Sequence, residues 1–199
     1  MTLTLLLGGA RSGKSDLATR LAHHSGEPVT VLATGEAGDE EMADRIARHR
    51  ADRPAGWDTL EEPLHVIDAV SSVEDRRTVV LDCLTLWVAN AMGAGWDDAE
   101  IEHHAVGLAE GLRTRPGRSV VVGNEVGWGI VPAEPFVRRY RDLHGRVNRI
   151  VSEAADEALL VVAGRVLPLI APEQLWADLD DRVGAHRDPG GRGGRGGRA

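Results

Sequence analysis

The sequence contains little cysteine, no long apolar run and a shortage of positive charge. Cys83 is the only cysteine, which excludes an intrachain disulfide. We find no signal peptide and no run of about 20 apolar residues, the length that a transmembrane helix needs. We therefore expect a cytoplasmic protein without a membrane span. The formal net charge of -8 disfavours a nucleic-acid-binding protein that relies on a positive field, so small molecules are the expected partners.

Lysine is unusually rare compared with arginine: Lys14 is the only lysine in the chain. It lies in Gly8–Ser15, which read GGARSGKS and match the P-loop pattern. A composition biased toward arginine could leave one lysine by chance. Its position inside the GK[ST] signature favours a functional role instead.

The P-loop follows the apolar run Leu3–Leu7 and precedes a helical pattern, which is the order that its mechanism requires. Gly8 and Gly13 would let backbone N–H groups turn toward phosphate oxygens at the positive end of the next helix. Lys14 would reach the β- and γ-phosphates, and the Ser15 hydroxyl would ligate Mg²⁺. The alternative is a glycine-rich turn with a chance lysine, but the position between strand and helix favours nucleotide binding.

Apolar, β-branched runs alternate with helical patterns along the chain, which is typical of a largely parallel sheet flanked by helices. The expected strands are Leu3–Leu7, Val29–Ala33, Thr78–Leu81, Ser119–Val122 and Leu159–Ala163. The expected helices are Ser15–His23, Asp39–His49, Leu64–Val70, Thr85–Met92, Ile101–Leu112 and Phe136–Ala155. We predict one doubly wound α/β domain over residues 1–170, without an internal repeat.

The end of the chain has a different composition. Residues 184–199 read GAHRDPGGRGGRGGRA, which has too little apolar area to offset its ordering entropy, so we predict a disordered Gly/Arg-rich tail. Residues 171–183 form a C-terminal extension between the domain and this tail. The arginines of the tail could make a weak contact with RNA or another polyanion, but a solubilising appendage is the simpler interpretation.

Polar residues follow several of the expected strands. Asp82 ends the run TVVLD, where a carboxylate would hold Mg²⁺ directly or through water, although it could instead cap the helix expected from Thr85. Ala33–Gly35 and Asn124–Glu125 follow two other strands, and such ends converge where ligands bind in open α/β sheets. Turn chemistry alone would also explain them, and for Thr34 both interpretations stay open.

His49 lies in the segment EMADRIARHRADRP, on the same expected helical face as Met42 and Ile46. A histidine in such a position is usually a packing residue. Four arginines are close to it in the sequence: Arg45, Arg48, Arg50 and Arg53. They could clamp a triphosphate and keep the imidazole neutral, and a neutral imidazole can be a nucleophile. The residues alone leave both roles open.

In their order along the chain, these motifs resemble the bifunctional adenosylcobinamide kinase/adenosylcobinamide-phosphate guanylyltransferase family of cobalamin biosynthesis. The resemblance extends from Leu3 to about Leu169. It rests on GGARSGKS, on RIARHRADRP with the following Trp57 and Glu61, on VLDCLT, on NEVGWGIVP (Asn124–Pro132) and on YRDLHGRVN (Tyr140–Asn148). The P-loop alone would not identify the family, whereas NEVGWGIVP is highly specific.

The resemblance implies a RecA-like P-loop NTPase fold, a homotrimer and two reactions. ATP or GTP phosphorylates the aminopropanol hydroxyl of adenosylcobinamide, and GMP is then transferred from GTP to the new phosphate, giving adenosylcobinamide-GDP. The guanylyl group passes through a histidine in this family, and His49 is at the matching position. Lys14 is the second implied catalytic residue, and Ser15 and Asp82 would hold Mg²⁺.

The resemblance also implies a set of nucleotide contacts. These are Gly8, Gly9, Ala10, Arg11, Ser12, Gly13, Lys14, Ser15, Ala33, Thr34, Gly35, Arg50, Ala51, Asp52, Arg53, Glu61 and Asp82. The family varies at Arg48, to which we assign no role. The acidic loop at Gly38–Glu40 departs from the family pattern and leaves the contacts of residues 35–40 open.

Two other functions stay open at this point. One is another small-molecule P-loop kinase without a covalent step. The other is a GTP-dependent switch protein, but such proteins typically recognise guanine with an Asn-Lys-x-Asp loop, and this chain has no second lysine with which to build one.

Overall fold

The computed structural model describes residues 2–176, apart from the side chain of Arg45. The tail expected at residues 184–199 lies outside this range, as does most of the expected extension at 171–183. The chain divides into Met1–Leu169 and Ile170–Ala199, of which the second is helical at residues 172–176. In the described part, no helix combines the length and the apolar character needed to cross a membrane.

Seven strands form one sheet in the order β3-β2-β4-β5-β1-β6-β7. They are β1 (Leu3–Leu7), β2 (Val29–Ala33), β3 (Asp58–Glu61), β4 (Thr78–Asp82), β5 (Ser119–Val122), β6 (Glu157–Val162) and β7 (Arg165–Leu169). Every neighbouring pair is parallel except β6 and β7. The prediction of a largely parallel sheet is therefore confirmed.

Two of these strands were not expected from the sequence. The edge strand β3 has only four residues, DTLE, and its end residues are exposed. The other, β7, forms a hairpin with β6 through Ala163 and Gly164, whose φ angles are 49° and 73°. Two positive φ values in a two-residue loop are typical of a type I′ turn. The predicted strand Leu159–Ala163 was therefore one residue too long at its end, because Ala163 belongs to the turn.

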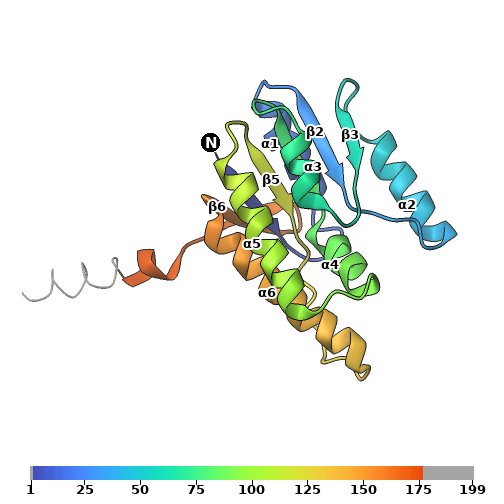
Figure 1. Cartoon of the computed structure of the whole chain (residues 1–199). Helices are drawn as coiled ribbons and strands as arrows, with labels where there is room; N and C mark the ends of the chain where they lie inside the picture. The colour runs from blue at the N-terminus through green and yellow to red at the C-terminus, as the bar shows by residue number, and fades with distance from the viewer. Residues whose placement is uncertain (1, 177–199) are drawn as a thin grey trace, which may run out of the picture. The chain divides into compact units, whose positions relative to one another are not determined.

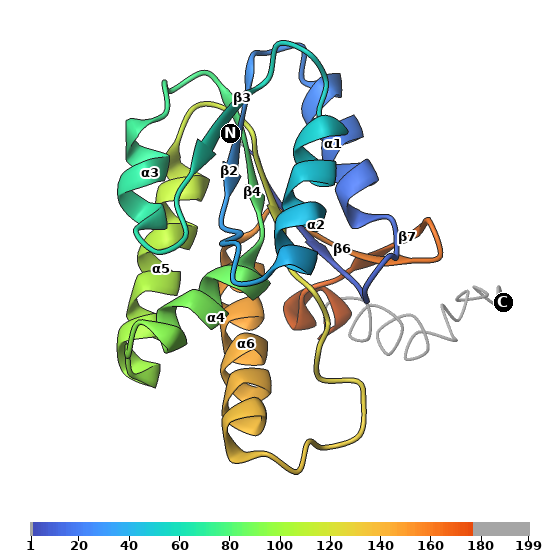
Figure 2. The same ribbon diagram turned by 90° about the vertical axis from the view of Figure 1, so that its right-hand side faces the viewer.

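Among the described residues up to Leu169, six helices accompany the sheet, close to the ranges expected. They are α1 (Lys14–His24), α2 (Glu40–Ala51), α3 (Val66–Ser72), α4 (Leu84–Gly93), α5 (Asp98–Thr114) and α6 (Pro135–Ala154). Figures 1 and 2 show α1 and α2 on one side of the sheet and α3, α5 and α6 on the other. Residues from both faces of the sheet are buried, which explains why the central strands read as continuous apolar runs.

The larger core lies between the sheet and helices α3 to α6. Trp87, Leu108 and Val147 are fully buried there. The smaller core packs Ala18 and Ala22 of α1 against the opposite face of the sheet. Burial of this extent provides the main stabilisation of the domain and fixes the strand ends that carry the polar residues.

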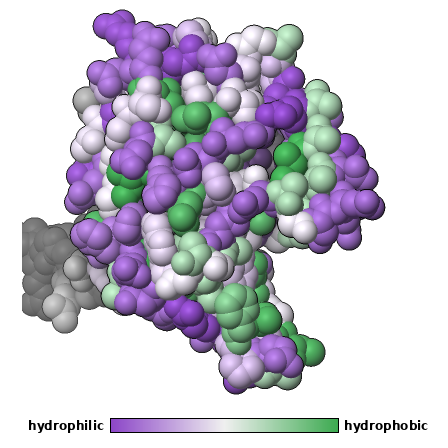
Figure 3. Space-filling view, turned by 45° about the vertical axis from the view of Figure 1, so that its right-hand side comes forward, coloured by the Kyte–Doolittle hydropathy of each residue, from purple (hydrophilic) through white to green (hydrophobic). Residues whose placement is uncertain are grey.

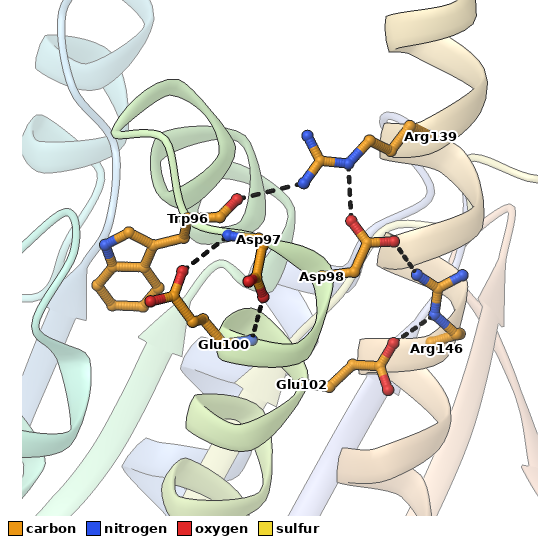
Figure 4. Close-up of polar contacts among 7 residues, drawn as sticks. All are labelled: Trp96, Asp97, Asp98, Glu100, Glu102, Arg139 and Arg146. Carbon is orange, nitrogen blue, oxygen red and sulfur yellow. Dashed lines mark hydrogen bonds and ion pairs between the residues drawn. The ribbon is translucent and has the colours of Figure 1, made fainter.

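The start of α5 is fastened to α6 by four charged residues, which we call the α5–α6 clamp: Asp98, Glu102, Arg139 and Arg146. Asp98 accepts hydrogen bonds from Arg139 Nε at 2.7 Å and from Arg146 Nη2 at 2.5 Å, and Glu102 accepts from Arg146 Nε at 2.6 Å (Figure 4). The hydrogen bond from Arg139 lowers the pKa of Asp98, burial opposes this effect, and the charge of Arg139 and the contact with Arg146 lower the pKa further. The clamp thus sets the position of α6 against α5.

Candidate functional site

The P-loop, residues 8–15, connects β1 to α1 and lies against the β6–β7 hairpin. Gly8 has a φ of 153°, and a Cβ atom at this position would lie 2.3 Å from the carbonyl oxygen of Val161. Gly13 caps α1 with a φ of 100°, in the left-handed region. The N–H of Gly164 donates to Ser12 O at 2.9 Å. Both predicted glycine positions therefore have a physical cause: a close backbone approach at Gly8 and a left-handed turn at Gly13.

Lys14 folds back into this loop and is only 5% exposed. Its Nζ donates to Gly8 O at 2.9 Å and to Gly9 O at 2.6 Å, and it lies 3.4 Å from Ser12 Oγ. The ammonium group is thus held at the N-terminal end of α1, where the helix dipole is also positive. A positive group and a helix N-terminus at one place form an environment suited to phosphate oxygens.

Asp82 and His49 meet beside the P-loop. Asp82 ends β4, and His49 lies in the last turn of α2, with its Nδ1 3.7 Å from Asp82 Oδ2. Both residues line a cavity of about 310 Å³ together with P-loop residues 10–15. Both also line an adjoining cavity of about 360 Å³ that runs along α1 past Asp52, Arg53 and Trp57. Volumes above about 300 Å³ are typical of small-molecule sites.

The arginines expected around His49 are separated by the structure. Arg50 forms an ion pair with Glu61, and Arg53 donates from Nη1 to Thr59 Oγ1 at 2.9 Å, so both reach toward β3. Burial lowers the pKa of Arg53, with the Asp82 carboxylate opposing this effect. Arg48 instead donates from Nε to the carbonyl of Asp44 in its own helix. Of these, Arg50 and Arg53 line the cavities at His49.

The segment after β2 forms the floor of a smaller cavity of about 60 Å³. Ala33 and Gly35 line it with Ile46 and Leu86. Thr34 is fully buried, and its hydroxyl donates to Cys83 O at 2.7 Å while accepting from Cys83 N at 2.8 Å. Thr34 therefore fixes the chain just after Asp82, and the nucleotide contact expected of it stays a prediction.

The acidic loop before α2 also has a structural explanation. Asp39 is the N-cap of α2, and its Oδ1 accepts a hydrogen bond from Met42 N at 2.7 Å. An N-cap carboxylate satisfies one of the free N–H groups of the first turn. The unusual residues at 38–40 thus begin the helix that carries His49, while Ala51 ends that helix on an exposed surface.

The oxygen atoms of Ser15 and Asp82 are the expected metal ligands, and both residues line the same two cavities. A hydroxyl and a carboxylate are hard oxygen donors of the kind that Mg²⁺ prefers, with phosphate oxygens and water completing its octahedron. Nowhere among residues 2–176 do three or more His, Cys, Asp or Glu side chains cluster as a metal site. The donor set therefore fits a nucleotide-bound Mg²⁺ better than a metal held by protein alone.

Several residues of these cavities were not assigned a role from the sequence. Asp16, Thr19 and Arg20 line the larger cavity from α1, and the available signal was that Thr19 follows Ser15, and Arg20 follows Asp16, by one helical turn. Asn124 lines the P-loop cavity from the loop after β5. The sequence placed Asn124 at a strand end where ligands are expected to bind, but assigned it no contact.

Comparison with known proteins gives a consistent result over most of the chain. A family model described as cobinamide kinase / cobinamide phosphate guanyltransferase matches residues 4–169. A relative from Pseudomonas aeruginosa, the bifunctional adenosylcobalamin biosynthesis protein CobP, is 46% identical over 166 residues, which cover 83% of this chain and 95% of the relative. The bifunctional adenosylcobalamin biosynthesis protein CobU of Escherichia coli is 37% identical over 175 residues, covering 81% and 96%.

Solved structures with similar folds are P-loop ATPases. A type III secretion ATPase aligns with a TM-score of 0.52 at 11% identity, covering 94% of this chain and 64% of that chain. The ATPase EscN of enteropathogenic E. coli aligns with a TM-score of 0.53 at 13% identity, covering 92% and 53%. At such identities the likeness concerns the fold alone, and it confirms the predicted P-loop NTPase architecture.

Proposed function

The chain belongs to the cobinamide kinase / cobinamide phosphate guanyltransferase family, and we propose that it carries out both reactions in the cavity between the P-loop, Asp82 and His49. The observation that carries this proposal is that a phosphate-binding loop and a histidine line one cavity. A simple kinase needs the first but not the second. The proposed catalytic unit is residues 1–170, acting in the cytoplasm on adenosylcobinamide, adenosylcobinamide phosphate, ATP and GTP.

For phosphorylation, we assign the triphosphate of ATP or GTP to the P-loop. Its N–H groups and Lys14 would balance charge on the transferring phosphoryl group, so catalysis depends mainly on positioning and electrostatics. Ser15 and Asp82 would hold Mg²⁺, which neutralises phosphate charge when bound. The substrate hydroxyl forms the new O–P bond as the bond to the nucleoside diphosphate breaks.

For guanylyl transfer, His49 attacks the α-phosphorus of GTP. Because Nδ1 faces the Asp82 carboxylate at 3.7 Å, we assign the attack to Nε2. At 3.7 Å the carboxylate is an ion-pair partner, and a closer approach to hydrogen-bond distance would fix the orientation and the tautomer of the ring. The N–P bond forms as pyrophosphate leaves. The phosphate of adenosylcobinamide phosphate then attacks the same phosphorus, which forms adenosylcobinamide-GDP and releases His49.

Asp52, Arg50, Arg53 and Glu61 complete the proposed guanine-nucleotide site at the edge of the sheet. Arg53 and Asp52 line the larger cavity, whereas Glu61 lines the smaller one. The pairing of Arg50 with Glu61 holds α2 against β3 and thereby holds His49 near Asp82. We therefore assign these four residues to both nucleotide contact and the placement of His49.

We further propose that the protein is a homotrimer. Five exposed apolar side chains lie on the loop before α6 and at the start of α6: Trp128, Ile130, Val131, Phe136 and Val137. Ile130 is 98% exposed, and Figure 3 shows hydrophobic residues gathered on this projecting end. Apolar patches of this kind usually mark interaction surfaces, which supports self-association.

The decisive experiment uses adenosylcobinamide, Mg²⁺ and GTP labelled at the α-phosphate. The wild-type protein should form both products and carry a label that survives denaturation, is lost in acid and persists in alkali, as a phosphorus–nitrogen bond requires. His49→Ala should lose the label and guanylyl transfer while keeping much of the kinase activity. Lys14→Ala should lose both reactions because both use the P-loop. Equal labelling of His49→Ala and wild type would exclude the covalent role of His49.

A further inference from the structure

Asn124 occupies a position between the two halves of the proposed phosphate site. It lies two residues beyond the end of β5, and β5 lies between β1, which leads into the P-loop, and β4, which ends at Asp82. Asn124 lines the same cavity as Lys14 and Asp82. The arrangement of the sheet therefore brings an amide side chain to the phosphate cavity, although Asn124 and Asp82 are 42 positions apart in the chain.

The orientation of the Asn124 amide is fixed by Thr85, the second residue of α4. Thr85 Oγ1 accepts hydrogen bonds from the backbone N of Asn124 at 3.0 Å and from its Nδ2 at 2.9 Å. Because the amide nitrogen is directed to Thr85, Oδ1 is the amide atom that this contact leaves available, and Asn124 lines the cavity. Asn124 thus presents a hydrogen-bond acceptor to the cavity.

A buried histidine fixes Thr85 in turn. His144 of α6 is fully buried, and its Nε2 lies 3.2 Å from Thr85 Oγ1. Burial lowers the pKa of His144 to about 4, so its ring is neutral at physiological pH. Both lone pairs of Thr85 Oγ1 accept from Asn124, which leaves the hydroxyl proton of Thr85 to donate, and Nε2 of His144 is an acceptor within reach. The hydrogen bonds from His144 through Thr85 to Asn124 are therefore consistent with a single orientation of the Asn124 amide.

Helix α6 also holds the backbone on both sides of this contact. Tyr140 donates from its hydroxyl to Thr85 O at 3.1 Å, and Asn148 donates from Nδ2 to Asn124 O at 3.1 Å. Tyr140, His144 and Asn148 are four residues apart and therefore share one face of the helix. This face supports Asn124, while Arg139 and Arg146 hold α6 to α5 through the clamp. Such support is expected for a side chain that must be positioned accurately.

We propose that Asn124 Oδ1 accepts a hydrogen bond from the substrate hydroxyl during phosphorylation and aligns the hydroxyl oxygen with the γ-phosphorus. A carbonyl-type oxygen carries partial negative charge and would repel phosphoryl oxygens, so a hydroxyl donor is its suitable partner. The amide is not a base. The hydroxyl proton passes to a phosphoryl oxygen as the O–P bond forms and the bond to the nucleoside diphosphate breaks, and it is then released to solvent. Orientation of an attacking oxygen by an amide has a precedent in GTPases, where a glutamine orients water.

This inference rests on the proposed assignment of the P-loop cavity, and it separates the two reactions of the enzyme. Guanylylation uses His49 as the attacking group, so it does not need Asn124. Phosphorylation uses the substrate hydroxyl, and on this proposal the hydroxyl needs Asn124 for its alignment. Thr85 and His144 do not touch the substrate and are positioning residues.

The test measures phosphorylation of adenosylcobinamide by ATP and, separately, labelling of the protein by α-labelled GTP. Asn124→Ala should lower kcat for phosphorylation about 100-fold, with the KM for ATP changed less than about threefold and the rate of labelling within about twofold of wild type. Thr85→Val should lower the same kcat about tenfold by freeing the amide, whereas Thr85→Ser, which keeps the oxygen, should retain it.

Each outcome decides the matter. An unchanged kcat in Asn124→Ala overturns the proposal, and so does a parallel loss of phosphorylation and labelling, which would indicate a structural role. If Asn124→Ala does not fold, as judged by circular dichroism, equal kcat values for Thr85→Val and Thr85→Ser overturn it. A wild type that phosphorylates nothing refutes the proposed function itself, whereas an active wild type with an inactive Lys14→Ala leaves that function intact whatever Asn124 does.

Discussion

The adjacent glycines Gly8 and Gly9 provide a quantitative test of the P-loop geometry. A Cβ atom at position 8 would lie 2.3 Å from Val161 O and 2.9 Å from Ser12 Oγ, while a Cβ atom at Gly9 meets nothing within 4 Å. Carbon and oxygen atoms in contact lie about 3.5 Å apart, so Gly8→Ala must separate the P-loop from β6 by about 1 Å. Gly9→Ala requires no movement, which makes it the matched control.

The expected cost of Gly8→Ala follows from two effects. Overpacking costs about 1 to 3 kcal/mol, and a φ in a sparsely populated region costs about 1 to 3 kcal/mol for a residue with a side chain. Because the loop and the hairpin can share the movement, we expect a loss of about 2 to 4 kcal/mol in the free energy of unfolding. For a chain of this size that corresponds to a fall in Tm of about 5 to 15 °C.

Urea unfolding monitored by circular dichroism measures the free energy for wild type, Gly8→Ala and Gly9→Ala. We expect Gly9→Ala to stay within about 1 kcal/mol of wild type. In Gly8→Ala, a phosphate site displaced by about 1 Å should also lower kcat/KM for phosphorylation about 100-fold. Equal unfolding free energies for the two variants would refute the close approach of Gly8 to Val161 on which this reasoning depends.

Two other predictions concern parts of the chain away from the site. Asp98→Asn removes the carboxylate at the centre of the α5–α6 clamp. The pKa of Asp98 is lower in the folded protein than in the unfolded chain. The carboxylate therefore stabilises the fold fully above the unfolded pKa of about 3.9, and this stabilisation is lost as the pH falls through the folded pKa. Since the Asp98 side chain is 40% exposed, we expect Asp98→Asn to lower the free energy of unfolding by only about 1 kcal/mol at pH 7. In unfolding curves recorded below about pH 4, the difference between the variant and wild type should shrink. The same difference in free energy at every pH would contradict the clamp. Truncation after residue 183 should leave Tm within about 2 °C and both activities near wild type, and a large fall in Tm would show that the removed residues contribute to the fold.

Much of the fold could be predicted because local and global signals agree in its central elements. The run Leu3–Leu7, the P-loop and the first helix each have a strong pattern of their own. The edge strand β3 has none, since DTLE is short and polar. Its conformation depends on pairing with β2 and on Arg77, which donates to Thr30 Oγ1 at 2.8 Å and forms an ion pair with Asp58. Contacts of this kind link distant segments and leave no local signal.

The same limit applies to the candidate site. Asp82 could be paired with the P-loop from sequence because it ends an apolar strand, and in the structure it lines the same cavity as Ser15. Asn124 also follows a strand, but its position depends on the strand order, which puts β5 between β1 and β4. The order of the strands along the sequence does not reveal their order in the sheet. The contacts of Thr34 with Cys83 likewise depend on how β2 and β4 pair.

Because His49 and the P-loop share one cavity, the two proposed reactions compete for the same site. On the proposed mechanism, ATP bound for phosphorylation and GTP bound for guanylylation exclude each other, so ATP competitively inhibits guanylylation, whereas GTP can serve in both reactions. When ATP is in large excess, the phosphorylated corrinoid leaves before a guanylylated enzyme is available and must be captured again. The balance of adenylate and guanylate pools then sets how much of the intermediate accumulates, without any separate regulatory site.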